Sequence, residues 1–183
     1  MNSFKCQAEE YEKSSNLQKE NGIELLRILA PQKGIKALDL GCGIGFHSKI
    51  LSALVGSDGL IIAIDPDAQR LAYARENYSA TNLHYLDGSV NSIPGNDYDL
   101  VFSSCVLHWI EDKDSVFKHV SRCLKSGGRF GFVCSTHSEM IDIVTEVTHS
   151  RDFVKAVKRD MHYTSADNLQ KQWLYCCRVE RGK

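Results

Sequence analysis

Along the chain, short continuous apolar runs alternate with segments in which apolar residues recur at helical spacing. Each change of pattern predicts a new strand or helix. Residues 35–40 form an apolar run that predicts a buried strand, and residues 44–54 repeat apolar side chains at helical spacing. Short apolar runs that end near Asp, Gly or Pro predict further strands. These strands are expected at residues 60–64, 83–86, 98–105 and 129–134, with helices at residues 67–78 and 115–124.

The two ends of the chain have less regular patterns. Residues 9–29 predict one or two amphipathic helices that break near Asn21-Gly22 and end at Pro31. The pattern after residue 136 is weaker, and it predicts no seventh strand. Its expected elements are a helix at residues 141–157, a last helix capped by Thr164 or Ser165, and a sixth strand at residues 174–179.

Strands that alternate with helices predict an α/β fold, with a doubly wound, mostly parallel sheet and helices on both faces. A length of 183 residues indicates one domain. Within it we expect an N-terminal helical cap at residues 1–31, a cofactor-binding core at residues 32–136, and an incomplete C-terminal part at residues 137–183.

A glycine turn joins the first strand to its helix. Gly41, Gly43 and Gly45 occupy alternate positions, and Phe46 stands where a dinucleotide fingerprint would have its third glycine. Asp39, two residues before the turn, would repel a pyrophosphate but suits an ammonium or sulfonium charge. The turn therefore predicts S-adenosylmethionine as the ligand and disfavours a nicotinamide-dependent oxidoreductase.

Acidic residues end the next two strands, where a doubly wound sheet binds its ligands. Asp65 can accept both ribose hydroxyls, and Asp87-Gly88 is placed to take the exocyclic amine of adenine. Two plainer interpretations stay open. Asp65 can cap a helix that begins at Pro66, and Asp87 can belong to an ordinary Asp-Gly turn.

In combination, these motifs resemble the class I S-adenosylmethionine-dependent methyltransferases, which have a Rossmann-like fold. The match begins at residues 38–45 and continues through residues 98–102 to residues 124–128, where Leu-Lys-Ser-Gly-Gly stands for the usual Leu-Lys-Pro-Gly-Gly. The resemblance implies that Asp39 and the glycine turn hold the methionine part of the cofactor. The expected cofactor-binding residues are Asp39, Gly41, Cys42, Gly43, Gly45, Asp65, Pro66, Asp87, Gly88 and Ser103.

Two shorter segments resemble the juvenile hormone acid and trans-aconitate methyltransferase group. They are residues 11–18 and the tripeptide Leu107-His108-Trp109. This resemblance implies O-methylation of a small carboxylic acid, with Gln18 closing over the methyl donor and Trp109 facing the acceptor. Gln18 and Trp109 are therefore candidate catalytic residues. His108 is a third candidate, as a general base for a phenol or amine acceptor, and Tyr11 is a further candidate for the acceptor pocket.

Each of these candidates has a plainer alternative. Trp109 can be core filler, Gln18 can lie on a solvated helix face, and His108 can orient a loop instead of acting as a general base. His47, at the start of the helix after the turn, is expected to be neutral and structural because an imidazolium beside a sulfonium would be unfavourable.

Composition narrows the classes of partner. Lys and Arg number 22 against 23 for Asp and Glu, so the charge balance gives no reason to expect binding to nucleic acid or to an anionic membrane.

Without a signal-like segment, the seven cysteines predict a reduced, cytoplasmic protein with no metal site. The expected partner is a small-molecule acceptor. Because the family usually continues further, a catalytically weak isoform that binds the cofactor and acts through partners stays open.

Overall fold

The computed structural model describes residues 16–134, 162–163 and 173–178. Its centre is a seven-stranded sheet in the order β3-β2-β1-β4-β5-β7-β6. The first five strands along the chain pair in parallel, and β7 pairs antiparallel with both β5 and β6. The strands are β1 (Lys36–Leu40), β2 (Leu60–Asp65), β3 (Leu83–Asp87), β4 (Tyr98–Ser104), β5 (Leu124–Cys134), β6 (His162–Tyr163) and β7 (Trp173–Arg178).

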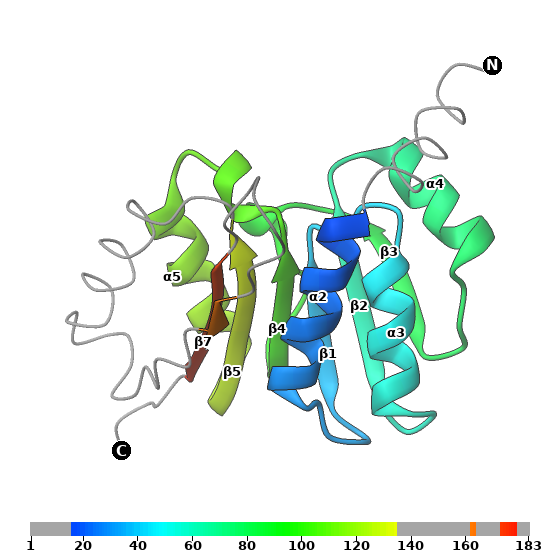
Figure 1. Cartoon of the computed structure of the whole chain (residues 1–183), viewed down its shortest axis with the longest axis horizontal. Helices are drawn as coiled ribbons and strands as arrows, with labels where there is room; N and C mark the ends of the chain where they lie inside the picture. The colour runs from blue at the N-terminus through cyan, green and yellow to red at the C-terminus, as the bar shows by residue number, and fades with distance from the viewer. Residues whose placement is uncertain (1–15, 135–161, 164–172, 179–183) are drawn as a thin grey trace.

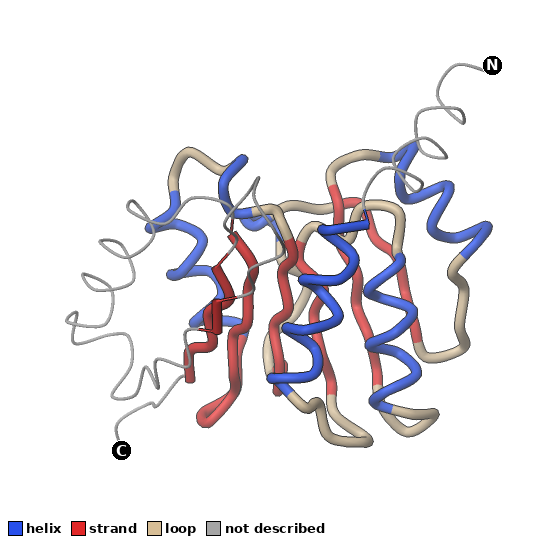
Figure 2. The backbone as a smooth tube through the Cα atoms, viewed as in Figure 1, coloured by secondary structure: helices blue, strands red, loops and turns tan. Residues whose placement is uncertain are grey.

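Helices cover both faces of this sheet, which confirms the predicted α/β architecture (Figures 1 and 2). One apolar cluster joins α2, α3 and α4 to one face, and a second joins α5 to the other. The 3-10 turns η1 (Val90–Ser92) and η2 (Leu107–Trp109) follow β3 and β4. The helices are α2 (Asn16–Leu29), α3 (Phe46–Val55), α4 (Ala68–Asn77) and α5 (Lys113–Cys123).

The sheet corrects one prediction about the C-terminal part. A seventh strand was not expected, yet β6 pairs with β7 through His162 and Tyr163. A strand of two residues is too short to show an alternating pattern, so only its pairing reveals it. The sixth strand predicted at residues 174–179 corresponds to β7, whereas the helices predicted at residues 141–157 and after residue 164 lie outside the described residues.

A second correction concerns the N-terminal helix. The predicted break near Asn21-Gly22 is wrong, because α2 runs through both residues. Asn21 is buried, and a Cβ atom on Gly22 would collide with the ring of His47 on α3. The glycine is therefore explained by the close approach of two helices, which outweighs its low helix propensity. The part of the predicted helix before residue 16 lies outside the described residues.

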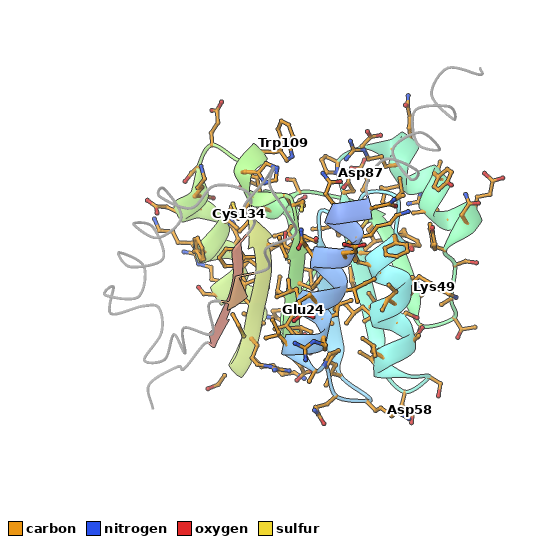
Figure 3. All side chains as sticks on the ribbon, viewed as in Figure 1. Glu24, Lys49, Asp58, Asp87, Trp109 and Cys134 are labelled. Atoms are coloured by element: carbon orange, nitrogen blue, oxygen red, sulfur yellow. The ribbon has the colours of Figure 1, made fainter. Side chains whose placement is uncertain are left out.

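The parallel strands place their carboxyl ends at one edge of the sheet. In Figure 3 the labelled residues Asp87 and Trp109 lie at this upper edge, and Asp58 lies at the opposite edge. The segments that follow β1, β2, β3 and β4 therefore meet in space, as expected for the ligand side of a doubly wound sheet. None of the helices within the described ranges is long and apolar enough to cross a membrane.

Candidate functional site

A cavity of about 740 Å³ opens at the carboxyl ends of the strands. This volume falls in the range of roughly 300 to 1,000 Å³ that is typical of small-molecule sites. Five segments line it: α2, the glycine turn, and the residues that follow β2, β3 and β4. Of the predicted residues, the lining includes Gln18, Asp39, Gly41, Cys42, Gly43, Asp65, Pro66, Gly88, His108 and Trp109.

The three turn glycines all have positive φ, but their surroundings differ. A Cβ atom on Gly41 would collide with Val106, and one on Gly45 would collide with Tyr85. A Cβ atom on Gly43, with φ of +54°, would meet nothing within 4 Å. Gly43 therefore borders open cavity, whereas the other two glycines allow protein segments to approach the turn.

Asp39 lies beneath this turn with 1% of its surface exposed. The hydroxyl of Ser48 donates to its Oδ2 atom at 2.6 Å. Burial raises the pKa of Asp39 to about 7, and the charge of Asp65 acts in the same direction. Near neutral pH this carboxyl group is therefore only partly ionised, and a cationic ligand beside it would stabilise the carboxylate.

Asp65 ends β2 and orders the turn from the other side. Its Oδ2 accepts the N–H of Gly43 at 2.8 Å, and its Oδ1 accepts the N–H of Asp67 at 2.9 Å. Helix α4 is capped by Asp67, which accepts the N–H groups of Gln69 and Arg70, so Asp65 is not its N-cap. A carboxylate has about four lone-pair sites, so Asp65 can still accept hydrogen bonds from ligand hydroxyls.

Three predicted cofactor-binding residues, Gly45, Asp87 and Ser103, are outside the described lining. Ser103 is fully buried, and its hydroxyl donates to the carbonyl of Leu40 at 2.8 Å, which ties β4 to β1. Asp87 is exposed, and the residues that follow it line the cavity instead. The contact of Asp87 with adenine stays a prediction.

Several lining residues were not predicted from the sequence. Ser89 and Asn91 face the cavity after β3, Cys105 faces it after β4, and Lys19 and Arg70 reach it from two helices. The motifs mark the strand ends but not the reach of side chains from α2 and α4. Only the packing of these helices brings Lys19 and Arg70 to the cavity.

The three candidate catalytic residues all line the cavity. Gln18 Oε1 and His108 Nδ1 are the buried side-chain polar atoms that lack a hydrogen-bond partner among the described residues. Trp109 is 81% exposed and its ring lies 5.2 Å from that of His108, so it is not core filler. Gln18 likewise borders the cavity instead of lying on a purely solvated face.

Burial keeps the two histidines near the cavity, His47 and His108, in their neutral form. Burial and the charge of Lys113 lower the pKa of His108, so its ring is neutral near pH 7. Burial also lowers the pKa of His47, which fits its expected neutral role. A neutral imidazole donates from one ring nitrogen and accepts at the other. Burial, with the nearby carboxyl groups, raises the pKa of the Cys42 thiol, so it is not a nucleophile.

These features fit S-adenosylmethionine. Asp39 offers a buried negative charge for a cation, Gly43 leaves room for a ligand against the backbone, and Asp65 retains acceptor capacity for hydroxyls. Within the described part of the chain, no group of three His, Cys, Asp or Glu residues is arranged to hold a metal ion. Tyr11 lies outside the described residues.

Comparison with known protein families identifies the family of this chain. The sequence profile described as "Methyltransferase domain" matches residues 31–177. The chain belongs to this methyltransferase family. The methyltransferase class predicted from the sequence is confirmed, and the similar solved structures include S-adenosylmethionine-dependent methyltransferases.

Proteins of similar sequence include viral, bacterial and insect methyltransferases. "Putative methyltransferase 235L" of Invertebrate iridescent virus 6 is 34% identical, over 89% of this chain and 66% of the viral protein. Malonyl-[acyl-carrier protein] O-methyltransferase of Pectobacterium atrosepticum is 30% identical, over 67% of this chain and 47% of that enzyme. Juvenile hormone acid O-methyltransferase of Bombyx mori is 26% identical, over 78% of this chain and 55% of that enzyme. The chain thus spans about half to two thirds of these relatives.

Solved structures confirm the Rossmann-like class I fold. An S-adenosylmethionine-dependent methyltransferase from Aquifex aeolicus superposes with a TM-score of 0.71 at 18% identity, over 95% of this chain and 97% of that one. A "putative methyltransferase" of Haloferax volcanii, solved with the Trm112 methyltransferase activator, gives 0.75 at 15% identity, over 99% of both chains. A methyltransferase from Mesorhizobium loti is 30% identical over 60% of this chain and 51% of that one, with a TM-score of 0.54.

Proposed function

We propose that this chain is an active S-adenosylmethionine-dependent methyltransferase that O-methylates the carboxylate of a small molecule. One observation carries the proposal: Gln18 and His108 present buried polar atoms without partners to the same cavity. Buried polar atoms are rarely left unpaired, so ligand groups are expected there. Gln18 Oε1 needs a donor such as an ammonium or hydroxyl group, whereas a protonated His108 Nδ1 can donate to a carboxylate oxygen. The names of two relatives, which methylate malonyl-acyl-carrier protein and juvenile hormone acid, support an acid as the acceptor.

The residues of the turn hold the donor in this proposal. When bound, S-adenosylmethionine supplies an electrophilic methyl group on a sulfonium. Asp39 would hold the ammonium group of the donor, and Asp65 would accept its ribose hydroxyls. The segment from Gly88 to Asn91 would border the base. Since Asp39 is buried, water does not weaken its attraction for the ammonium group.

The acceptor would bind on the side of η2. Because His108 is neutral, it can donate an N–H to one carboxylate oxygen without placing a positive charge beside the sulfonium. The other oxygen is then available for methyl transfer, and an ionised carboxylate needs no general base. Catalysis would consist of positioning, which contributes up to about 7 to 11 kcal/mol in well-oriented reactions.

Trp109 would form the apolar rim of the acceptor site. Its ring is 81% exposed at the mouth of the cavity, where it can cover the hydrocarbon part of an acceptor. Ligand pockets are lined mostly by apolar and aromatic side chains, with a few polar groups that fix the orientation of the ligand. The proposal therefore favours acids with an apolar body over small, strongly polar acids.

The test is methyl transfer to matched pairs of acceptors. Each pair has one carbon skeleton that ends in a carboxylate or in a primary amide, with phenols, amines and arsenite as further acceptors. We expect methyl esters from apolar acids only. A His108→Gln variant should lower kcat more than donor affinity. Methylation of amines, phenols or arsenite, with no ester formed, would contradict the proposed acceptor class.

A second candidate function is cofactor binding without efficient catalysis. The chain spans 66% of the length of the viral relative and 47% of the length of the bacterial O-methyltransferase. The Haloferax volcanii structure shows that a protein of this fold can work with an activator. Tight donor binding with no transfer to any acceptor would favour this candidate, and no donor binding would contradict both.

A further inference from the structure

The amino-acid end of the donor carries two charges, an ammonium and a carboxylate. Asp39 can pair with the ammonium, but a buried carboxylate also needs a cation or donors of its own. Among the described residues, two basic side chains line the cavity, Lys19 on α2 and Arg70 on α4. Their positions decide which of them can meet the amino-acid end.

Lys19 lies at the glycine-turn end of the cavity. Its Nζ atom is 4.9 Å from the ring centroid of Phe46, which is the first residue of α3 and also lines the cavity. Arg70 lies at the other end, where its Nε is 3.5 Å from Oδ2 of Asp67, beyond the ribose candidate Asp65. Lys19 is therefore the cation on the side of Asp39 and the turn.

His47 fixes the backbone of Lys19 in this place. Its Nε2 lies 3.1 Å from the carbonyl oxygen of Lys19, and because the ring is neutral, an Nε2–H tautomer donates to that oxygen. The ring also contacts Phe46 and Phe102, with centroids 5.2 and 5.7 Å away. A Cβ atom on Gly22 would collide with the same ring, so α2 and α3 pack at close range.

The start of α3 adds to the positive potential around Lys19. Its N-cap is Gly45, in the left-handed conformation, and no side chain caps this end. Helix N-termini favour negative charge. The helix end supports an anion site here, while the ammonium group of Lys19 is the group that defines it.

We propose that Lys19 binds the carboxylate of the donor's amino-acid end, and that His47 is a positioning residue that holds Lys19 over the glycine turn. The inference rests on S-adenosylmethionine as the donor and deepens that part of the proposed function. Asp39 and Lys19 together form a pair of opposite charges that matches the zwitterion. The site thereby selects adenosyl ligands that carry an intact amino acid.

The experiment compares two ligands by titration calorimetry. One is S-adenosylhomocysteine, and the other is its decarboxylated analogue, which keeps the amine but lacks the carboxylate. Lys19→Met should weaken the first ligand about 10-fold to 150-fold, as expected for a hydrogen bond between charged groups. It should change the affinity for the analogue less than about 3-fold, since a charge-assisted bond is absent in that complex.

Two further lysine and arginine variants serve as controls. Lys49→Met removes a charge from the same helix as His47, but Lys49 lies outside the cavity and donates to the carbonyl of Ser79, so neither affinity should change. Arg70→Met removes the other cation of the cavity, and it should change both affinities by one common factor. Equal losses for both ligands in Lys19→Met would overturn the carboxylate assignment.

The positioning role of His47 has its own readout. His47→Phe keeps a ring but loses the N–H, so it should weaken S-adenosylhomocysteine more than the decarboxylated analogue. His47→Gln, which restores a donor, should recover part of the loss. Equal weakening of both ligands by His47→Phe would mean that the ring only supports the fold. If the unmodified protein binds neither ligand, the donor site itself is contradicted, which is a different outcome from an unchanged Lys19→Met.

Discussion

Asp39 shows how a functional charge opposes stability at the scale of one residue. Burial raises its pKa in the folded state to about 7, from a reference value of 3.8. Between these values the folded protein binds more protons than the unfolded chain, so the free energy of unfolding falls as pH rises through this window. The slope is at most about 1.4 kcal/mol per pH unit.

Asp39→Asn should separate stability from donor binding. Asparagine can still accept the hydrogen bond from Ser48 but does not ionise. At pH 8 the free energy of unfolding of the variant should therefore be about 1 to 3 kcal/mol higher than that of the unmodified protein. Its affinity for S-adenosylmethionine should fall because the ammonium group loses its partner. Denaturant unfolding at pH 5 and pH 8 checks the first effect. A stability gain of equal size at both pH values would contradict the charge argument.

The same residue predicts the pH dependence of the unmodified protein. Donor binding requires the ionised form of Asp39, so affinity for S-adenosylmethionine should fall as pH decreases below about 7. Calorimetry with 5′-methylthioadenosine, which lacks the amino acid, is the control and should show little pH dependence between pH 6 and pH 8.

Gly43→Val should abolish donor binding in a folded protein. A side chain at this position would enter the cavity, because nothing else lies within 4 Å. The matched control is Gly34→Val, since Gly34 has φ of +78°, equally open surroundings and a place outside the cavity. Both variants should lose similar stability from backbone strain, and only Gly43→Val should lose binding. Binding retained by Gly43→Val would show that the ligand does not approach the turn.

At the scale of elements, η2 connects the sheet to the acceptor side of the site. Residues 107–109 follow β4 after Cys105 and Val106, and Leu107 is buried while Trp109 is exposed. Leu107 anchors the turn in the core, so its neighbours point to the cavity. The sequence pattern did not distinguish Trp109 at a cavity mouth from Trp109 in the core, because an isolated aromatic residue carries no periodicity.

Trp109→Ala should lower turnover more than donor affinity. The exposed ring contributes little to the core, so the free energy of unfolding should change by less than about 0.5 kcal/mol, as for most surface substitutions. Steady-state kinetics with an apolar acid and calorimetry with S-adenosylhomocysteine measure the two effects. Equal losses in both would place the ring in the donor site.

The N-terminal helix shows where local rules mislead. Asn21-Gly22 has the composition of a break, yet α2 continues because Gly22 lets the helix approach His47. Helix propensity differs by about 1 kcal/mol between Gly and Ala, which the packing of buried residues such as Leu25 and Leu29 outweighs. The sequence predicted the existence of this helix but not its continuity.

At the scale of the whole molecule, β7 protects the edge of β5. Six residues of β5, Arg129–Cys134, pair with β7 in register. The residues that line the cavity all precede β5. The C-terminal strands therefore complete the sheet, while the donor site is built upstream of them.

A chain that ends after Cys134 should retain donor affinity but associate with itself. Removal of β7 would expose the hydrogen-bonding groups of β5, and open strand edges favour pairing with other chains. Size-exclusion chromatography with light scattering, at several concentrations, measures the association. A monomeric truncated chain with full donor affinity would show that β7 does not protect the edge.

The sequence by itself determined the order of strands and helices, the glycine turn and the acidic residues Asp39 and Asp65, because each leaves a local signal in spacing or residue type. Only the tertiary structure decided that Asp87 stays outside the cavity lining, that β6 completes the sheet, and that Lys19 reaches the cavity. Those features depend on how separate elements pack, and a pattern within one element does not encode the distance to another.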